Sequence, residues 1–176
     1  EILFLGVILL VISLCLSLWF RAPGLPQSHE YFSHAVRTAL YAEHFRNGDV
    51  FPIWFSSDGL GLGSPLALFY HKTFYYVAGV LYAVSGAVKF ALVIAVAVFM
   101  LIGAYGMRAA TRLITGNAVL MIVSASALLL SQYAFTDWLI RAAMAEFSAM
   151  MLIPWLLWWC LLLARHGRFS IAIVPI

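Results

Sequence analysis

Charged residues are scarce in this sequence, and that scarcity decides the class of protein. Of its 176 residues, 10% are charged and 65% are hydrophobic, and the mean hydropathy is +1.01. This composition excludes a soluble globular domain. Several apolar runs come close to the ~20 residues that a helix needs to cross a bilayer. The sequence therefore predicts an all-α, polytopic helical membrane protein.

Cysteines are few, and basic runs and nucleotide-binding motifs are absent. Cys15 and Cys160 both lie in apolar runs, where cysteine behaves as a small hydrophobic residue, so neither indicates redox or metal chemistry. The net charge of +3 comes without the basic runs that bind nucleic acid, so no nucleic-acid partner is expected. The spaced glycines of 59–63 match neither a dinucleotide fingerprint nor a P-loop.

The apolar runs predict a single transmembrane domain. Its expected spans are residues 2–20, 88–107, 118–135 and 143–164, and a further span begins near residue 169. The first run has no basic segment before it and no small-residue cleavage site after it, which favours a retained helix over a signal peptide. Because the sequence starts without Met and stops inside an apolar run, we expect the N-terminal part of a longer chain. Further spans or partner subunits would complete it.

Basic residues near the span ends predict the orientation in the membrane. Arg108 and Arg112 follow the second span, and Arg165 and Arg168 follow the fourth, so the positive-inside rule places all four in the cytoplasm. The segment 21–87 is then outside. We expect an integral membrane protein, surrounded by membrane lipid.

Two stretches of the outer segment are predicted to be amphipathic interfacial helices. Residues 29–46 follow Ser28, which can act as an N-cap, and precede a stop signal at Asn47; they carry an apolar and a polar stripe at helical spacing. Residues 66–85 carry many aromatic side chains, and reading them as a span would reverse the basic residues against the positive-inside rule. The glycines and prolines of 49–65 predict an ordered loop.

Glu30, His34 and Arg37 recur at helical spacing, so their side chains can converge on one point above the bilayer. Such a trio can be a general base, a divalent-metal site or an anion clamp. It can equally be a solvated helix face with an ordinary ion pair, and spacing alone leaves these alternatives open. His29 and His44 are expected to face water or lipid headgroups.

A second polar cluster contains Asp137, Arg141 and Glu146, at the outer ends of the third and fourth spans. Glu146 is expected about one turn inside the fourth span, where an unpaired carboxylate is costly, so a cationic partner is expected. Arg141 is near in the sequence, and Arg37 or Lys72 can compete for the same carboxylate. The cluster is interpreted either as an ion pair that positions helices or as a substrate contact.

Several motifs together resemble a known family. They are Glu30-x-x-x-His34-x-x-Arg37, the NGDVFPIW of 47–54, the GLGSP of 61–65 and Phe69-Tyr70. They look like the first outer loop of polytopic bacterial proteins of the GT-C glycosyltransferase superfamily. The nearest pattern is that of 6-pyruvoyl-tetrahydropterin synthase-related membrane proteins, and the YfhO and protein-mannosyltransferase types are more distant. Residues 141–146 are similar to an Arg-Gly-x-x-x-Glu element of that group, and the resemblance extends from residue 30 to about residue 155.

The resemblance implies a GT-C-like fold, a place in the bacterial inner (cytoplasmic) membrane, and the transfer of a sugar from a polyprenyl-phosphate donor to an acceptor at the outer face of that membrane. It implies that Glu30 is the catalytic base and that His34 orients it or shares a divalent metal ion with it. Arg37 and Arg141 are expected to hold the donor phosphate. Further substrate contacts are expected at Asp58, His71, Lys72 and Glu146. Two positions depart from the family: Glu30 stands where Asp is common, and Ala142 stands where Gly is usual.

Two functions of other classes stay open. The polar residues can simply order the outer loop of a non-catalytic membrane subunit or scaffold. A lipid or solute transporter is less favoured, because the spans carry few charges near the midplane and no broken-helix pattern.

Overall fold

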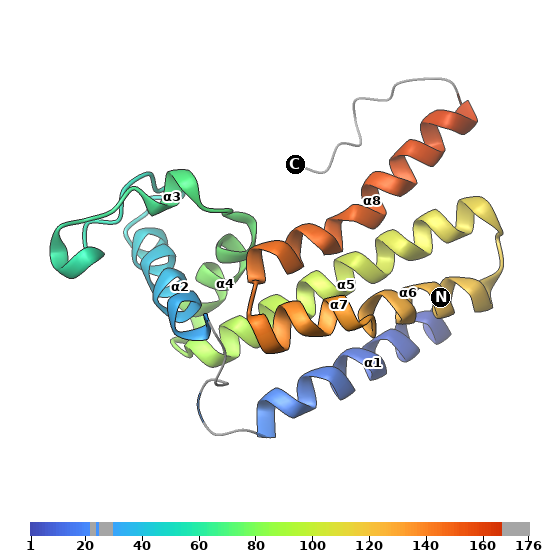
Figure 1. The fold of residues 1–176 in the computed structure, drawn as a ribbon, viewed down its shortest axis with the longest axis horizontal. Coiled ribbons are helices and arrows are strands. Elements are labelled where there is room, and N and C mark those ends of the chain that lie inside the picture. Colours follow the sequence, from blue (N-terminus) through green and yellow to red (C-terminus); the bar gives the residue numbers. More distant parts are fainter. Residues whose placement is uncertain (22–23, 25–29, 167–176) are drawn as a thin grey trace.

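The computed structural model describes residues 1–21, 24 and 30–166, and over these ranges it is all-helical, without a β-strand. The long helices lie side by side in a bundle, and the shorter helices pack together at one end of it (Figure 1). The bundle consists of α1 (Ile2–Arg21), α5 (Val88–Ile114), α6 (Ala118–Leu129) and α8 (Met144–His166). The prediction of an all-α fold is confirmed.

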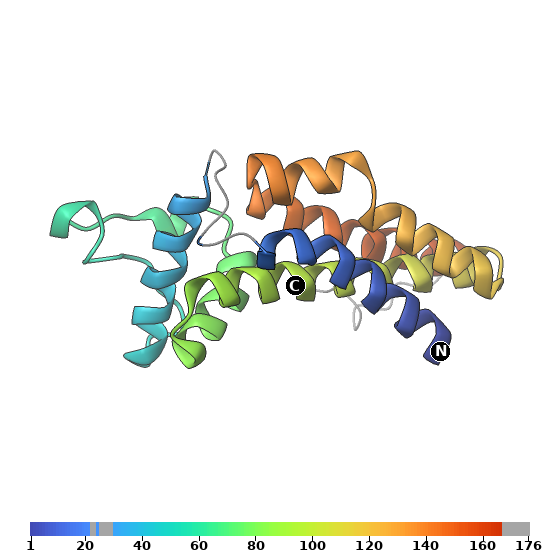
Figure 2. The ribbon, with the colours of Figure 1, turned by 90° about the horizontal axis from the view of Figure 1, so that it is seen from below.

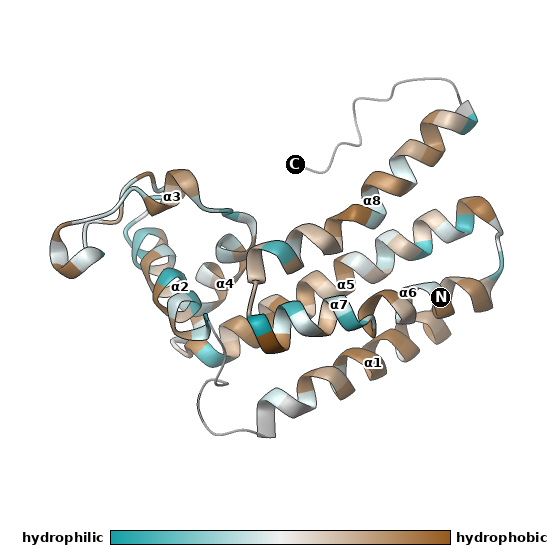
Figure 3. Cartoon of the chain, in the orientation of Figure 1, coloured by the Kyte–Doolittle hydropathy of each residue, from teal (hydrophilic) through white to brown (hydrophobic). Residues whose placement is uncertain are grey.

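Three helical stretches are long and apolar enough to cross a membrane: 88–114, 118–141 and 144–165. At 1.5 Å per residue, α5 is about 40 Å long, which exceeds a hydrocarbon core of ~30 Å. Figure 3 shows apolar residues along most of this bundle. In α1 the apolar stretch Ile2–Ser17 is shorter, and the crossing of the membrane by α1 stays a prediction.

Close contact between α5 and α8 forms the centre of the bundle. A Cβ atom at Gly103 would come within 2.5 Å of the Met151 sulfur, so a larger residue would require the Met151 side chain to move. Trp155 follows the helix-interior residue Pro154, and its indole nitrogen donates to the carbonyl of Ile102 at 2.8 Å. The two helices are therefore joined by packing and by one hydrogen bond across the apolar interior.

The third predicted span, 118–135, is not one continuous helix. Its first part, α6, ends at Leu129, and Ser131 begins the short helix α7 (Gln132–Phe135) by accepting a hydrogen bond from the amide of Ala134 at 3.2 Å. A π-helical turn, η2 (Thr136–Arg141), continues the chain where the sequence predicted an outer connection. The interruption arises because the Ser131 hydroxyl competes locally for backbone groups.

The predicted helix 66–85 is also divided. It forms α3 (Leu66–Phe69) and α4 (Thr73–Ser85), because Tyr70 adopts an extended backbone and its ring lies under the guanidinium of Arg37, 4.0 Å away. The 13 residues of α4 extend about 20 Å, which is too short to cross a bilayer. This agrees with the prediction that the segment is not a span, and its place at the membrane interface stays a prediction.

Helix α2 (Tyr31–Arg46) packs against α4 and lies across the end of the bundle (Figure 2). Helix 29–46 was predicted; the helix begins two residues later, with Glu30 at the N-cap position and no side-chain capping bond. The predicted roles of Ser28 and His29, the position of Arg168 and the span expected from residue 169 fall outside the described residues.

The loop between α2 and α3 is ordered, as predicted. Phe55 and Ser64 exchange two backbone hydrogen bonds of 2.9 and 3.0 Å. One carboxylate oxygen of Asp58 accepts from the amide of Gly59 at 2.9 Å, and the other accepts from the Ser64 hydroxyl. Gly63, with φ of +81°, faces the indole of Trp54 so closely that a Cβ atom would clash with it.

Candidate functional site

Glu30 lies at the start of α2 and points toward two residues of the same helix. Its carboxylate is 3.6 Å from Nε2 of His34 and 3.7 Å from Nη1 of Arg37. The predicted convergence of the three side chains is therefore confirmed. The Glu30 side chain is 47% exposed, so its carboxylate is open to solvent while it forms an ion pair with Arg37.

His34 is fully buried, and both of its ring nitrogens have hydrogen-bond partners. Nε2 contacts the backbone carbonyl of Ala142, which can only accept, so we assign the hydrogen to Nε2. Burial lowers the pKa of His34 to about 4, although the Ala142 carbonyl opposes this change. The ring is therefore neutral at pH 7, and Nδ1 accepts from the hydroxyl of Tyr75 at 2.5 Å.

Arg37 is fixed from two sides by aromatic residues. Its guanidinium lies over the ring of Tyr70 and donates from Nη1 to the hydroxyl of Tyr75 at 3.3 Å. Tyr75 thus accepts from Arg37 and donates to His34, and its buried position raises the pKa of its phenol. Hydrogen bonds in such a chain polarise one another, which favours one arrangement of the three side chains.

The second cluster is centred on Arg141. Nη1 of Arg141 is 3.0 Å from the carboxylate of Asp137, and Nη2 is 3.1 Å from the carboxylate of Glu146. The predicted partner of Glu146 is therefore confirmed as Arg141. Asp137 is fully buried, whereas Arg141 is 50% exposed, so the guanidinium extends from the interior to the surface. Tyr133 donates its hydroxyl hydrogen to Glu146 and completes the cluster.

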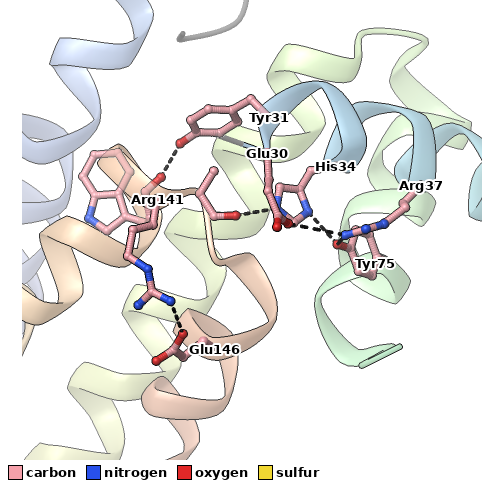
Figure 4. Close-up of polar contacts among 9 residues, drawn as sticks. Glu30, Tyr31, His34, Arg37, Tyr75, Arg141 and Glu146 are labelled. Carbon is pink, nitrogen blue, oxygen red and sulfur yellow. Dashed lines mark hydrogen bonds and ion pairs between the residues drawn. The ribbon is translucent and has the colours of Figure 1, made fainter. Parts of the chain in front are cut away.

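Two side chains of α2 connect the clusters (Figure 4). Tyr31 donates to the backbone carbonyl of Trp138, and His34 donates to that of Ala142, so both reach the segment that contains Arg141. Ala142 has φ of +55°, a left-handed conformation that favours glycine. This is the position where Gly is usual in the family that the sequence resembles.

A pocket of about 330 Å³ opens beside α2. Its lining residues are Phe32, Ser33, Val36, Arg37, Leu40, Asp58 and Leu66. The fold therefore brings Arg37 and Asp58, two predicted substrate contacts, to one pocket. Asp58 already uses both carboxylate oxygens to order its own loop, which indicates a structural contribution there.

His71 and Lys72 lie between α3 and α4, directly after the tyrosine that stacks on Arg37. His71 is exposed and lies 3.4 Å from the Thr73 hydroxyl, and Lys72 is partly exposed. Among the residues that the structure describes, no ion pair joins either side chain to Glu30 or to Glu146. Their role in substrate binding stays a prediction.

The donor set around Glu30 is too small to hold a metal ion by itself. In the described part of the chain, no three His, Cys, Asp or Glu side chains gather closely enough to hold one. Both ring nitrogens of His34 are already hydrogen-bonded, which leaves the Glu30 carboxylate as the open donor of the predicted pair. The metal requirement stays a prediction, and no chemical step below depends on it.

Sequence reasoning missed Tyr31 and Tyr75 as members of the site. Tyr75 belongs to the aromatic-rich stretch 66–85, which hydropathy predicts to be an interfacial helix, and Tyr31 directly follows Glu30 in the sequence. Their partners lie 41 and 107 residues away along the chain. No local spacing signals a contact over such separations, so only a prediction of the tertiary contacts could have found them.

The fold and site define a class of protein: an all-helical chain with three helices long and apolar enough to cross a membrane, and a polar cluster at one end of the bundle. The sequence matches no protein-family model, no curated protein and no solved structure.

Proposed function

We propose that this chain is part of a GT-C-type membrane glycosyltransferase, which transfers a sugar from a polyprenyl-phosphate donor to an acceptor at the outer membrane face. The observation that carries the proposal is the position of Glu30. Its carboxylate is half exposed at the end of a bundle of apolar helices and is held by Arg37. The sequence resemblance described above supports the donor class, and fold analogy alone would not.

In the proposed reaction, Glu30 accepts the proton of the acceptor hydroxyl while that oxygen attacks the anomeric carbon. The bond between this carbon and the phosphate oxygen breaks, and the polyprenyl phosphate leaves with the electron pair, which inverts the configuration. Arg37, 3.7 Å away, orients the Glu30 carboxylate. Buried, neutral His34 cannot take this proton easily, so it acts as a positioning residue for Glu30.

Arg141 is the better placed of the two predicted phosphate ligands. Its side chain is 50% exposed, while that of Arg37 is 18% exposed and covered by Tyr70. Arg141 is also shared by two carboxylates, so a donor phosphate would displace the exposed Glu146 rather than the buried Asp137. Charge-assisted hydrogen bonds to phosphate are strong enough to compete with a surface ion pair.

The experiment that tests this proposal is sugar transfer in membranes that contain the full protein, with a radiolabelled polyprenyl-phosphate sugar. Glu30→Gln should lower the rate roughly 10²- to 10⁴-fold, because it removes the general base and keeps the shape. Glu43→Gln, on the same helix and exposed, is the matched control and should leave the rate unchanged. Wild-type transfer by Glu30→Gln would exclude Glu30 as the base.

A non-catalytic scaffold is the second candidate, and one observation favours it. Tyr31 and His34 are buried and donate to backbone carbonyls, so part of the polar cluster fastens α2 to the bundle. If the scaffold hypothesis is right, Glu30→Ala and Arg141→Ala will reduce the yield of folded protein in detergent. Under the enzyme hypothesis, Glu30→Ala folds and loses transfer. Arg141→Ala also leaves the buried Asp137 without its cation, so only Glu30→Ala separates the two hypotheses.

A further inference from the structure

The end of the bundle opposite α2 contains a second pocket, which the proposed reaction does not use. It is lined by residues of α1, α5 and α6. Figures 1 and 2 show the first residues of α1 near the end of α5 and the start of α6. The volume of the pocket is about 210 Å³, and its lining residues are Glu1, Leu3, Phe4, Arg108, Ala118, Met121 and Ile122. Apart from one carboxylate and one guanidinium, this lining is apolar.

Arg108 is the cation of this pocket. Its side chain is 21% exposed, and its guanidinium lies 5.2 Å from the centre of the Phe4 ring. The carboxylate of Glu1 is 3.4 Å from Nη2 of Arg108 but is 73% exposed. An ion pair with so exposed a carboxylate contributes little, so a phosphate group can replace Glu1 and form charge-assisted hydrogen bonds with the guanidinium.

The position of the pocket along the bundle matches that of lipid headgroups. Arg108 lies near the C-terminal end of α5, and this helix is longer than the hydrocarbon core. Large apolar side chains of α1 and α6 are exposed around the same end of the bundle: Ile2, Leu3, Val119, Leu120 and Val123. Hydrocarbon chains would cover these side chains in a membrane, directly beside a partly buried guanidinium.

We propose that this pocket binds an anionic phospholipid. The lipid phosphate contacts Arg108 in place of Glu1, and the acyl chains lie along the apolar faces of α1 and α6. The Arg108 guanidinium and the lipid phosphate have opposite charges and would lie at the same depth, and basic pockets between membrane helices recognise anionic headgroups. The proposal does not depend on the transferase activity or on the side of the membrane that this end faces.

The test is lipid binding to the full protein, delipidated in detergent and titrated with dioleoyl phosphatidylglycerol or dioleoyl phosphatidylcholine. Native mass spectrometry reports the fraction of protein that carries a lipid. Phosphatidylglycerol should bind more tightly than phosphatidylcholine, and Arg108→Gln should weaken phosphatidylglycerol binding about fivefold, as expected for one basic residue at a membrane surface. Arg112→Gln, exposed on the last turn of α5 and outside the pocket, is the matched control and should change binding little.

Glu1→Gln separates loss of folding from loss of the site. This variant removes the competing carboxylate, so phosphatidylglycerol should bind more tightly, a gain that misfolding cannot produce. Equal binding of both lipids, unchanged binding by Arg108→Gln or an equal loss in Arg112→Gln would overturn the proposal. Displacement of the lipid by soluble glycerol phosphate would also overturn it, because the site would then take free phosphate rather than a lipid.

Discussion

Burial of His34 ties the stability of this protein to pH. The ring is neutral in the fold, with a pKa lowered to about 4 by burial, whereas an unfolded histidine has a pKa of about 6.5. Between these values the unfolded chain binds a proton that the folded chain does not bind. The pKa difference therefore stabilises the fold by its full amount above pH 6.5, and this stabilisation decreases as the pH falls toward 4.

We expect the free energy of unfolding to fall by about 3 kcal/mol between pH 7 and pH 4, which follows from a pKa difference of about 2.5 units at 1.36 kcal/mol per unit. Thermal melts of the detergent-solubilised protein at several pH values would measure this loss. His34→Gln keeps a donor for the Ala142 carbonyl and should flatten the pH dependence over this window. A slope as steep in His34→Gln as in the wild type would show that other groups cause it.

Ala142 has a left-handed backbone conformation that its Cβ atom disfavours. Its φ of +55° is left-handed, which costs an alanine roughly 1–2 kcal/mol, whereas its buried methyl group contributes about 0.8 kcal/mol. Ala142→Gly should therefore be neutral or slightly stabilising. Ala142→Val should be strongly destabilising, because a β-branched residue is poorly tolerated in this conformation. Melting temperatures of the two variants would decide, and equal destabilisation by both would contradict the backbone argument.

At the scale of elements, Tyr75 of α4 fixes the position of α2. Its hydroxyl contacts His34 and Arg37 while its ring stacks on Tyr41 of the same helix, with 5.7 Å between the ring centres. His34 in turn donates to the carbonyl of Ala142, directly after η2, and so joins α2 to that segment. One hydroxyl group therefore influences how three elements meet at the candidate site.

Tyr75→Phe keeps the ring and removes this hydroxyl, which leaves Nδ1 of buried His34 without its donor. We expect a destabilisation of about 1–3 kcal/mol, the usual cost of a buried unsatisfied group. Tyr76→Phe, the adjacent and partly exposed tyrosine, is the control and should change stability little. Chemical unfolding in detergent would measure both, and equal effects would show that the hydrogen bond to His34 is unimportant.

For the whole molecule, two sets of charges lie at opposite ends of the bundle. The cluster around Glu30 and Arg141 lies at the end with α2, and Arg108 lies at the other end, near the first residue of the chain (Figures 1 and 4). The fold therefore separates the predicted outer segment from the basic residues that set the predicted orientation. Which end faces the cytoplasm stays a prediction from the positive-inside rule.

Cysteine labelling tests that orientation. In a protein with Cys15→Ala and Cys160→Ala, we would compare Leu62→Cys and Ile114→Cys, two exposed apolar positions with 86% and 64% exposure. A membrane-impermeant maleimide should label Leu62→Cys in intact cells and Ile114→Cys only after permeabilisation. The reverse pattern would show the opposite orientation in the membrane, with Glu30 on the cytoplasmic side.

The sequence by itself determined the helical class, three apolar stretches that can cross a membrane, and the local contacts of Glu30 with His34 and Arg37. These follow from hydropathy and from helical periodicity, which act over a few residues. Helix boundaries were less predictable, because the Ser131 hydroxyl and the ring of Tyr70 interrupt apolar runs through contacts that hydropathy does not register.

Only the tertiary structure decided which partners the buried side chains of the polar cluster have. His34 reaches a backbone carbonyl 108 residues away, and Tyr31 reaches one 107 residues away. Such contacts depend on how helices pack, and no spacing in the sequence encodes them. They bury His34 and so lower its pKa, whereas the Glu30 carboxylate stays half exposed, because helix packing encloses the first side chain and leaves the second at the surface.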